Sequence, residues 1–473
     1  MNAITNVAQS SDSPADLLAL LRAAFRRDGA PSLANRRSDL LRLRATLIAN
    51  RSKIEAAINM DFGHRSRHET SIMEVAGLIG GIDYLRNLPR MMRPEKRHVA
   101  ILMRAGSARV EYQPLGVVGV MAPWNYPVVL ALMPLVTAIA AGNRVMLKPS
   151  EFMPNINALL EEILGSVFPI DQVAVVNGDA SVGATFSALP FDHLIFTGST
   201  AVGRKVMQAA SEHLVPVTLE LGGKSPVIVE KGHQLVHASA GIVFGKLVSG
   251  GQTCIAPDYA LIHVDDLQAF LTGYDTAVVA AYPDGPSADD YTRIVNDRHL
   301  ARLTGLLADA RDKGATVREV GREGRGAHPR AMRPTVVIDV TDDMMIAREE
   351  IFGPILLVFS YQTIEEAIAF VDARPRPLAL YYYGRDKAAQ RKVLDGTVSG
   401  NVTINGTIMH IAQDDLPFGS VGASGMGAYH GIEGFRRLSH AKGVYEQGRW
   451  NSMTLFRAPF GKMADLILGI VLR

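Results

Sequence analysis

The sequence predicts an α/β fold built on parallel sheets whose strands are joined by crossover helices. Short β-rich runs alternate with helical patterns at the spacing of βαβ units, first densely and then less regularly. The 473 residues are enough for two or three domains. Hydrophobic residues make up 48% and charged residues 20%, a globular composition that argues against disorder.

The first clear pattern is an amphipathic helix over residues 39–61, with Ser38 or Asp39 as its N-cap. A dense alternation follows. Strands are expected at residues 117–122, 144–147, 173–176, 193–196, 216–221 and 226–229, and helices at residues 128–141, 154–166, 182–188 and 203–210. This order predicts a parallel sheet covered by helices.

A second α/β unit begins after about residue 221, where the alternation becomes less regular. Strands are expected at residues 261–264 and 335–340, helices at residues 300–313 and 364–373, and an exposed loop at residues 321–334. The apolar C-terminal run, residues 463–472, predicts first a docked helix and second a membrane-surface helix. The longest apolar stretch, residues 128–141, is shorter than the ~20 residues of a membrane span.

Charge and cysteine usage exclude several classes of function. Lys and Arg total 49 and Asp and Glu total 47, so the net charge of +2 gives no reason to expect a nucleic acid as partner. The single cysteine, Cys254, excludes an intramolecular disulfide and a multi-cysteine metal site. Together with the absence of a visible secretory signal, it predicts a cytoplasmic protein.

The lone thiol is the first candidate for chemistry. Cys254 follows a Ser-Gly-Gly-Gln-Thr run, in which small residues let other backbone approach closely. A free cysteine is most often a buried structural residue. A core thiol needs no such loop, however, so a reactive thiol remains the second interpretation.

Two segments could bind a nucleotide. Residues 198–203 have the pattern GxTxxG between a strand and a helix, where backbone amides can meet a phosphate; a plain tight turn is the alternative. Lys148 and Glu151 follow another strand, where each could hold a ribose hydroxyl. A surface ion pair is the alternative for these two residues.

Three further segments carry polar groups in unusual settings. Glu220 lies between leucines at a strand end, so its pKa would be raised and it could act as a base; the alternative is a hydrogen-bonded core residue. Asn125 lies between two prolines and could donate to an oxyanion, or it is a turn residue. Residues 348–354 place two acids and an aromatic ring before Gly-Pro, and a helix end with solvated acids is their alternative.

Together these six segments resemble the aldehyde dehydrogenase superfamily, over residues 20–445. The strings at residues 219–226, 251–254 and 350–354 are the most specific. Residues 255–259 and 417–431 are similar to the class 3-like branch. Residues 61–70 resemble bacterial coniferyl aldehyde dehydrogenases, or form a capped helix start with solvated charges.

The resemblance implies a role for each candidate. Cys254 matches the nucleophile, Glu220 the general base and Asn125 the oxyanion donor. The implied cofactor contacts are Lys148 and Glu151 on the adenosine ribose, Gly198, Ser199 and Gly203 at the pyrophosphate, and Glu350, Phe352 and Trp124 around the nicotinamide.

The implied reaction is the oxidation of an aldehyde to a carboxylic acid through a cysteine thiohemiacetal and thioester, without a metal. NAD is the expected cofactor, with NADP tolerated, because Glu151 would repel a 2′-phosphate. The expected substrate is aromatic, coniferyl aldehyde giving ferulate. A medium- or long-chain fatty aldehyde is the alternative, and a cysteine esterase or hydrolase without nucleotide is the alternative from another class.

The resemblance also implies how the chain is divided. Residues 1–98 and 118–220 form a Rossmann-type NAD-binding domain and residues 221–423 an α/β catalytic domain. Residues 99–117 and 439–448 form oligomerisation strands that pair across the subunits of a homodimer. The tail, residues 449–473, gates the substrate entrance, packs as a surface helix, or touches a membrane.

Overall fold

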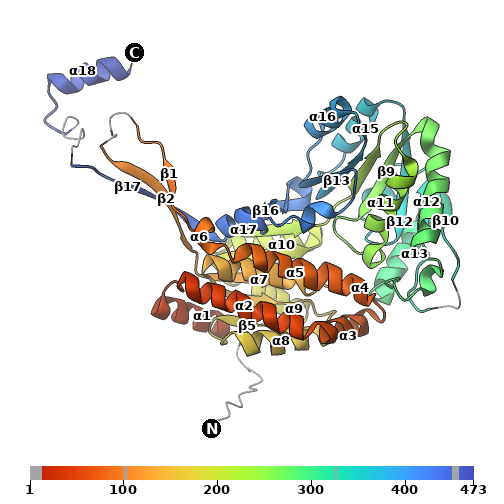
Figure 1. The fold of residues 1–473 in the computed structure, drawn as a ribbon, viewed down its shortest axis with the longest axis horizontal. Helices are drawn as coiled ribbons and strands as arrows, with labels where there is room; N and C mark the ends of the chain where they lie inside the picture. The colour runs from red at the N-terminus through yellow and green to blue at the C-terminus, as the bar shows by residue number, and fades with distance from the viewer. Residues whose placement is uncertain (1–12, 101–102, 104, 325–327, 450–456, 473) are drawn as a thin grey trace, which may run out of the picture.

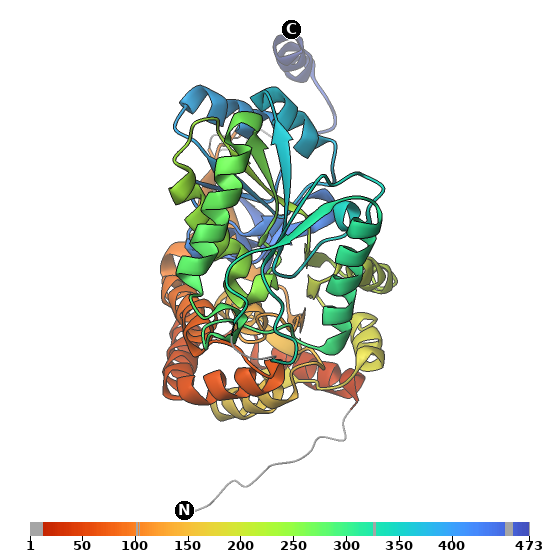
Figure 2. The ribbon, with the colours of Figure 1, turned by 90° about the vertical axis from the view of Figure 1, so that its right-hand side faces the viewer.

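The residues that the structure describes form two large sheets and a small projecting one (Figure 1). The computed structural model describes residues 13–100, 103, 105–324, 328–449 and 457–472. Each large sheet has seven strands and is accompanied by its own helices; Figure 2 looks onto the unit of the second sheet, whose helices lie on both sides of its strands. The expected α/β fold with parallel sheets is confirmed.

The first sheet has the strand order β15-β16-β7-β6-β3-β4-β5. The five consecutive strands from β7 to the edge strand β5 are parallel to one another. They are β3 (Val117–Met121), β4 (Arg144–Lys148), β5 (Val173–Val175), β6 (His193–Gly198) and β7 (Val217–Leu221). Between them run α7 (Val129–Ala141), α8 (Pro154–Val167), α9 (Ala180–Ser187) and α10 (Thr200–Ser211). The elements expected for this half are all present, within a few residues.

Two short strands from the end of the chain complete this sheet. β16 (Gly425–Ala428) lies antiparallel to β7, and β15 (Gly419–Ser420) lies antiparallel to β16. Gly425 is paired with Glu220. A segment from the C-terminal part of the sequence therefore covers the edge strand that carries the candidate base.

The second sheet has the order β10-β11-β12-β9-β8-β13-β14, and only β10 is antiparallel to its neighbour. Its strands are β8 (Ser225–Val229), β9 (Pro257–His263), β10 (Thr316–Glu319), β11 (Thr335–Ile338), β12 (Ile355–Tyr361), β13 (Ala379–Tyr383) and β14 (Asn401–Ile404). Its helices are α11 (Leu235–Leu247), α12 (Leu267–Ala281), α13 (Asp297–Asp312), α14 (Met345–Arg348), α15 (Ile364–Asp372) and α16 (Lys387–Gly396).

The helices before the first sheet differ from expectation. The single helix expected over residues 39–61 is wrong, because Asn50 separates α2 (Leu33–Ala49) from α3 (Arg51–Phe62). Asn50 caps the end of α2, where its side-chain amide donates to the Thr46 carbonyl. The N-cap of α2 is Ser32, not Ser38 or Asp39. The remaining helices of this region are α1 (Pro14–Asp28), α4 (Arg67–Glu69), a π-helical segment (Thr70–Ala76), α5 (Gly77–Leu85) and α6 (Leu88–Met91).

A three-stranded sheet projects from the first unit as an arm (Figure 1). It contains β1 (Glu95–Arg97), β2 (Ser107–Pro114) and β17 (Ser439–Glu446), which follows α17 (Gly431–Arg437). β17 pairs with β2 antiparallel over eight residues, from Ser439 opposite Pro114 to Glu446 opposite Ser107. The two segments expected to meet across subunits are thus paired with each other inside one chain.

The C-terminal helix, α18 (Lys462–Val471), stands beyond the tip of this arm (Figure 1). Ala464 is its only buried residue, whereas Leu466 and Ile470 are 59% and 68% exposed. The expectation of a helix docked on the fold of its own chain is therefore wrong. The apolar side chains find no partner surface on the described part of the same chain.

Candidate active site

The loop that carries Cys254 is a tight left-handed turn between α11 and β9. The three residues from Ser249 to Gly251 have φ angles of 54°, 61° and 75°. A β-carbon at Gly251 would lie 2.3 Å from the carbonyl oxygen of Gly353, so a side chain there would collide. The turn brings the partly buried Cys254 to the start of β9. The glycines before the thiol thus serve the path of the backbone.

Asn125 lies directly against this loop. It follows β3, it is 3% exposed, and its Nδ2 donates to the Gln252 carbonyl oxygen at 3.0 Å. The neighbouring Tyr126 shares a 2.8 Å hydrogen bond between its Oη and Thr253 Oγ1. Since a side-chain amide has two N–H donors, the second one of Asn125 remains for a ligand. The candidate oxyanion donor and the candidate nucleophile, 129 positions apart in sequence, are therefore neighbours.

Glu220 lies in β7 with one carboxylate oxygen engaged. Its Oε2 accepts a 2.6 Å hydrogen bond from Ser420 Oγ, while its Oε1 is buried without a partner among the described residues. Glu220 is 2% exposed, and burial raises its pKa well above the ordinary value of a glutamate. A carboxylate with a raised pKa and a free oxygen can accept a proton near neutral pH.

Glu350 lies against the two glycines that follow β7. A β-carbon on Gly222 would meet its Oε2 at 1.9 Å, and the Gly223 N–H donates to its carboxylate. Burial raises the pKa of Glu350 to about 7. Gly222 therefore leaves space for the acid that approaches from the second unit, and Gly223 donates a backbone hydrogen bond to it.

Three aromatic rings join the two units beside this acid. The rings of Trp124 and Phe352 meet edge to face, with centroids 5.4 Å apart, and the His299 ring lies 5.0 Å from Trp124. Phe352 is held at a φ of 52°, which is strained for a large side chain. Trp124 and Phe352, both predicted to lie around the nicotinamide, thus pack against each other across the two units.

The electrostatic setting of Cys254 favours the neutral thiol. Burial, followed by the charges of Glu350 and Glu220, raises its pKa to about 12. Only the thiolate is an effective nucleophile, so a base must remove the proton before the thiol can attack. The charges of both carboxylates therefore oppose ionisation of the sulfur.

The candidate ribose contacts lie at the carboxyl end of β4. Lys148 is 5% exposed, and its Nζ lies 3.1 Å from Glu151 Oε2. The two side chains form an ion pair, but Lys148 is buried, so the pair is not the surface ion pair of the alternative interpretation. It lies at the carboxyl edge of a parallel sheet, which is where nucleotides bind in such folds.

The turn after β6 begins α10 at the same edge of the sheet. Ser199 is the N-cap of α10, and its Oγ accepts from the Val202 N–H. A β-carbon at Gly203 would lie 2.6 Å from Leu221 Cδ2, so the helix packs closely on β7. An N-terminus held in this way presents free N–H groups and a positive dipole end to a phosphate. Together with Lys148, these residues fit a dinucleotide.

Several residues at the site have no role in the sequence analysis. Ser420 belongs to the segment 417–431, which the sequence analysis used only as a sign of the class 3-like branch. The side chain of Gln252 fixes the loop by donating to the Ser249 and Arg293 carbonyls and accepting from the Val295 N–H. Arg65 donates to the Asn125 carbonyl from the segment 61–70, for which a capped helix start with solvated charges was the alternative interpretation. Apart from Ser249, which lies three residues before Gln252, each partner is distant along the chain, so the local sequence does not indicate these contacts.

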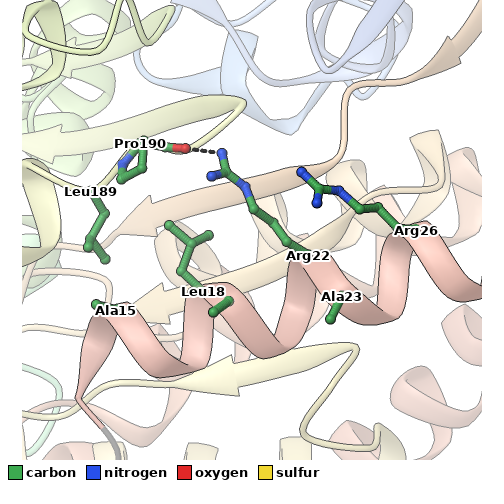
Figure 3. A pocket seen from close by; sticks show the side chains of 8 residues that line it. Ala15, Leu18, Arg22, Ala23, Arg26, Leu189 and Pro190 are labelled. Atoms are coloured by element: carbon green, nitrogen blue, oxygen red, sulfur yellow. Dashed lines mark hydrogen bonds between the residues drawn. The ribbon is translucent and has the colours of Figure 1, made fainter.

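A pocket of about 330 Å³ lies elsewhere, between α1 and the turn at Leu189 and Pro190 (Figure 3). Arg22 and Arg26 reach over it, and Arg22 donates to the Pro190 carbonyl. None of the candidate site residues lines it. It plays no part in the chemistry described above.

Comparison with known proteins identifies the family. A sequence profile described as the aldehyde dehydrogenase family matches residues 4–444. The chain belongs to this family. Aldehyde dehydrogenases oxidise aldehydes to carboxylic acids with NAD(P) as hydride acceptor, so the expected activity and cofactor are confirmed.

Individual aldehyde dehydrogenases match over nearly the whole chain. A probable coniferyl aldehyde dehydrogenase of Pseudomonas aeruginosa is 48% identical, over 94% of this chain and 93% of the relative. Mouse aldehyde dehydrogenase family 3 member A2 is 40% identical, over 93% of this chain and 90% of the mouse protein. The solved structure of Staphylococcus aureus AldH, in a substrate-bound state, has a TM-score of 0.90 at 35% identity, covering 96% of this chain and 99% of that one.

No group of three or more His, Cys, Asp and Glu residues in the described part of the chain is arranged to hold a metal ion. None of the helices that the structure describes is both long and apolar enough to cross a membrane.

Proposed function

We propose that this aldehyde dehydrogenase oxidises coniferyl aldehyde, and related aromatic aldehydes, with Cys254 as nucleophile, Asn125 as oxyanion donor and Glu220 as base. The observation that carries the proposal is the hydrogen bond from Asn125 to Gln252, which holds the amide beside the thiol's loop. The name of the Pseudomonas aeruginosa relative supports the choice of substrate.

In this mechanism the Cys254 thiol loses its proton to the buried base and its sulfur attacks the aldehyde carbon. The unpartnered Oε1 of Glu220 is the acceptor available for that proton. The carbonyl oxygen becomes negative and takes hydrogen bonds from the second N–H of Asn125 and from the Cys254 N–H. Removing one such donor typically costs about 10²–10³ in rate.

NAD, when bound, supplies the acceptor for the hydride that leaves the tetrahedral carbon. The acyl group is then held on Cys254 as a thioester. After the first proton has passed from Glu220 to solvent, the carboxylate takes a proton from water, whose oxygen attacks the thioester carbon. The C–S bond breaks, the acid is released and Glu220 returns its proton to the Cys254 sulfur. The bond from Ser420 keeps the carboxylate in place through these proton transfers.

The cofactor contacts proposed are those at the edge of the first sheet. Lys148 and Glu151 hold the adenosine ribose, Ser199 with Gly198 and Gly203 forms the pyrophosphate turn, and the second unit contributes Glu350 and Phe352 opposite Trp124. The first unit is thus the NAD-binding domain and the second the catalytic domain. Glu151 makes NAD the preferred cofactor over NADP.

The apolar side chains near the thiol's loop fit a large aldehyde. Phe244 on α11 is 50% exposed and Met409 is 49% exposed. The segment that carries Met409 lies against α11, because Thr407 Oγ1 donates to the Gly241 carbonyl of that helix at 2.6 Å. These exposed apolar side chains suit a flat aromatic aldehyde. They suit an alkyl chain as well, so long-chain aldehydes are the second candidate.

The deciding experiment measures product formation from coniferyl aldehyde, benzaldehyde, hexanal and decanal, each with NAD and with NADP. Because coniferyl aldehyde is coloured, ferulate is quantified by chromatography. We expect the highest kcat/KM with coniferyl aldehyde and NAD. A clear preference for decanal assigns the enzyme to long-chain aldehydes, and higher efficiency with NADP overturns the role of Glu151. An esterase without nucleotide would hydrolyse esters but form no NADH.

We further propose a cytoplasmic homodimer in which the arm meets the second copy. The arm carries an outer β17 strand on a projecting sheet, and α18 beyond it exposes apolar residues that need a partner surface. In the dimer α18 covers the substrate entrance of the neighbouring subunit; contact with a membrane surface is the alternative for this helix.

A further inference from the structure

The turn after α3 places a fully buried arginine beneath the candidate oxyanion donor. Arg65 and its partner Glu74 both have side chains that are 0% exposed, with Nη1 of Arg65 lying 3.3 Å from Glu74 Oε1. The same Nη1 donates to the backbone carbonyl of Asn125 at 2.7 Å. The guanidinium also lies over the ring of Tyr126, 4.7 Å from its centroid. The arginine therefore touches the peptide of Asn125 and the residue after it.

Glu74 ties the arginine to the helix that follows Asn125. Its Oε2 accepts from the N–H groups of Val128 and Val129, both at 2.9 Å, at the start of α7. Asn125 is thus held on three sides: at its carbonyl by Arg65, at its amide by Gln252, and through the α7 N-terminus by Glu74. A buried charge pair without further hydrogen bonds gains little stability. Here the hydrogen bonds of Arg65 and Glu74 orient the short loop that contains Asn125.

The same turn also holds the loop of the nucleophile. Glu69, four residues after Arg65, accepts a 3.1 Å hydrogen bond at Oε1 from the N–H of Ser249. Ser249 is the first left-handed residue of that loop. One short segment therefore touches the backbone on both sides of the reacting carbonyl.

We propose that Arg65 is a positioning residue of this aldehyde dehydrogenase, which sets the place of the Asn125 amide relative to Cys254. This inference rests on the proposed role of Asn125 as oxyanion donor. Lysine cannot replace the arginine, because its compact ammonium lacks the planar fork that stacks on Tyr126 while it donates to the carbonyl. A shift of the amide by about 1 Å suffices to slow the reaction about 10²-fold.

The test uses single-turnover hydride transfer with benzaldehyde at saturating NAD. The variants are Arg65→Lys and the charge-balanced double variant Arg65→Met/Glu74→Gln, in which the introduced amide oxygen can still accept from the α7 N–H groups. The matched control is Arg36→Met. Arg36 is a 3% exposed arginine that also donates to a carbonyl of α7, that of Ala140 at the far end of the helix. Asn125→Ala is made alone and combined with the double variant.

We expect hydride transfer to fall about 10- to 100-fold in both Arg65 variants, with an unchanged rate of Cys254 alkylation. The Arg36 control loses thermal stability but keeps its hydride-transfer rate within about twofold. The combined variant is no slower than Asn125→Ala alone, because Arg65 acts through that amide.

Arg65 variants that lose only melting temperature, or whose effect multiplies with that of Asn125→Ala, overturn the inference while the proposed function stands. Parallel loss of Cys254 alkylation also overturns it, because the nucleophile loop itself is then disturbed. A normal rate in Asn125→Ala removes the oxyanion donor from the proposed function, and the inference fails with it.

Discussion

At the scale of single residues, the site pairs one thiol with two acids, Glu220 and Glu350, whose pKa values are raised. Burial keeps Cys254 neutral, and the nearby Glu350 has a pKa of about 7. The thiol therefore becomes more reactive as pH rises, while the charge that appears on Glu350 above pH 7 opposes this gain. The two effects can be separated because Cys254 is the only cysteine.

Replacement of Glu350 by glutamine should speed the alkylation of Cys254 in the cofactor-free enzyme. The substitution removes a negative charge that raises the thiol's pKa, so more thiolate forms at a given pH. We expect about a three- to tenfold faster reaction with iodoacetamide at pH 9 and no difference at pH 5, where the parent Glu350 is already neutral. Glu349→Gln, on the exposed neighbour, should change neither rate. A slower reaction of Glu350→Gln at pH 9 would contradict this account.

The sequence could identify the reacting residues but not what holds them. Cys254, Glu220 and Asn125 stand in short strings whose residue types already indicate chemistry. Ser420 and Arg65 reach the site only through tertiary structure, from 200 and 60 positions away from the residues they bond. The charges around Arg65 suggest a solvated turn, because a sequence does not show that Glu74 folds back to neutralise them.

At the scale of elements, a left-handed backbone path shapes the loop of the nucleophile, and the side chains of Gln252 and Glu69 hold it in place. Strands such as β3 and β7 were predictable because apolar β-branched runs leave them few alternatives. The break at Asn50 was not, because the apolar spacing continues through it and only the side-chain bond to Thr46 marks the end of the helix. The left-handed path from Ser249 to Gly251 was signalled only as a cluster of small residues.

Substitution of Gly251 by alanine should impair both folding and catalysis. The φ of 75° and the approach of the Gly353 carbonyl leave no room for a methyl group. We expect a loss of about 1–3 kcal/mol in the free energy of unfolding, with a strong loss of NADH formation in the folded fraction. The matched control is Gly305→Ala in α13, where a β-carbon meets nothing within 4 Å; it should keep activity and gain roughly 0.5–1 kcal/mol. Denaturant unfolding and steady-state assays compare the two, and equal stability in both variants would refute the steric argument.

At the scale of the whole molecule, the chain exposes apolar side chains that it does not bury against itself. The arm and α18 extend away from both large sheets (Figure 1), and α18 has apolar side chains on most of its exposed face. A monomer with this shape would carry an exposed hydrophobic patch of the kind that marks an interaction site. We expect the partner to be a second copy of the chain, because most soluble oligomers are symmetric homo-oligomers.

Light scattering should therefore give a mass of about twice 51.1 kDa. Deletion of residues 457–473 should raise the KM for decanal and coniferyl aldehyde more than that for acetaldehyde, because small substrates do not contact the gating helix. Leu466→Ser/Ile470→Ser, which keeps the length of the tail, should reproduce the change. A monodisperse monomer would contradict the dimer, and unchanged KM values in both variants would reject the gate.

The pairing of β16 with β7 has a consequence for synthesis at the ribosome. The nascent chain contains Cys254, Asn125 and Glu220 long before Ser420 exists, because Ser420 follows Glu220 by 200 residues. At roughly 5–20 residues per second, that interval lasts about 10–40 seconds. During this time β7 is an unpaired edge and its glutamate has no hydroxyl to hold it. A truncated mRNA that ends after the codon for residue 414 would thus encode Cys254, Asn125 and Glu220 but not Ser420. Its product would be an incomplete catalyst, and the unpaired edge of β7 would favour aggregation.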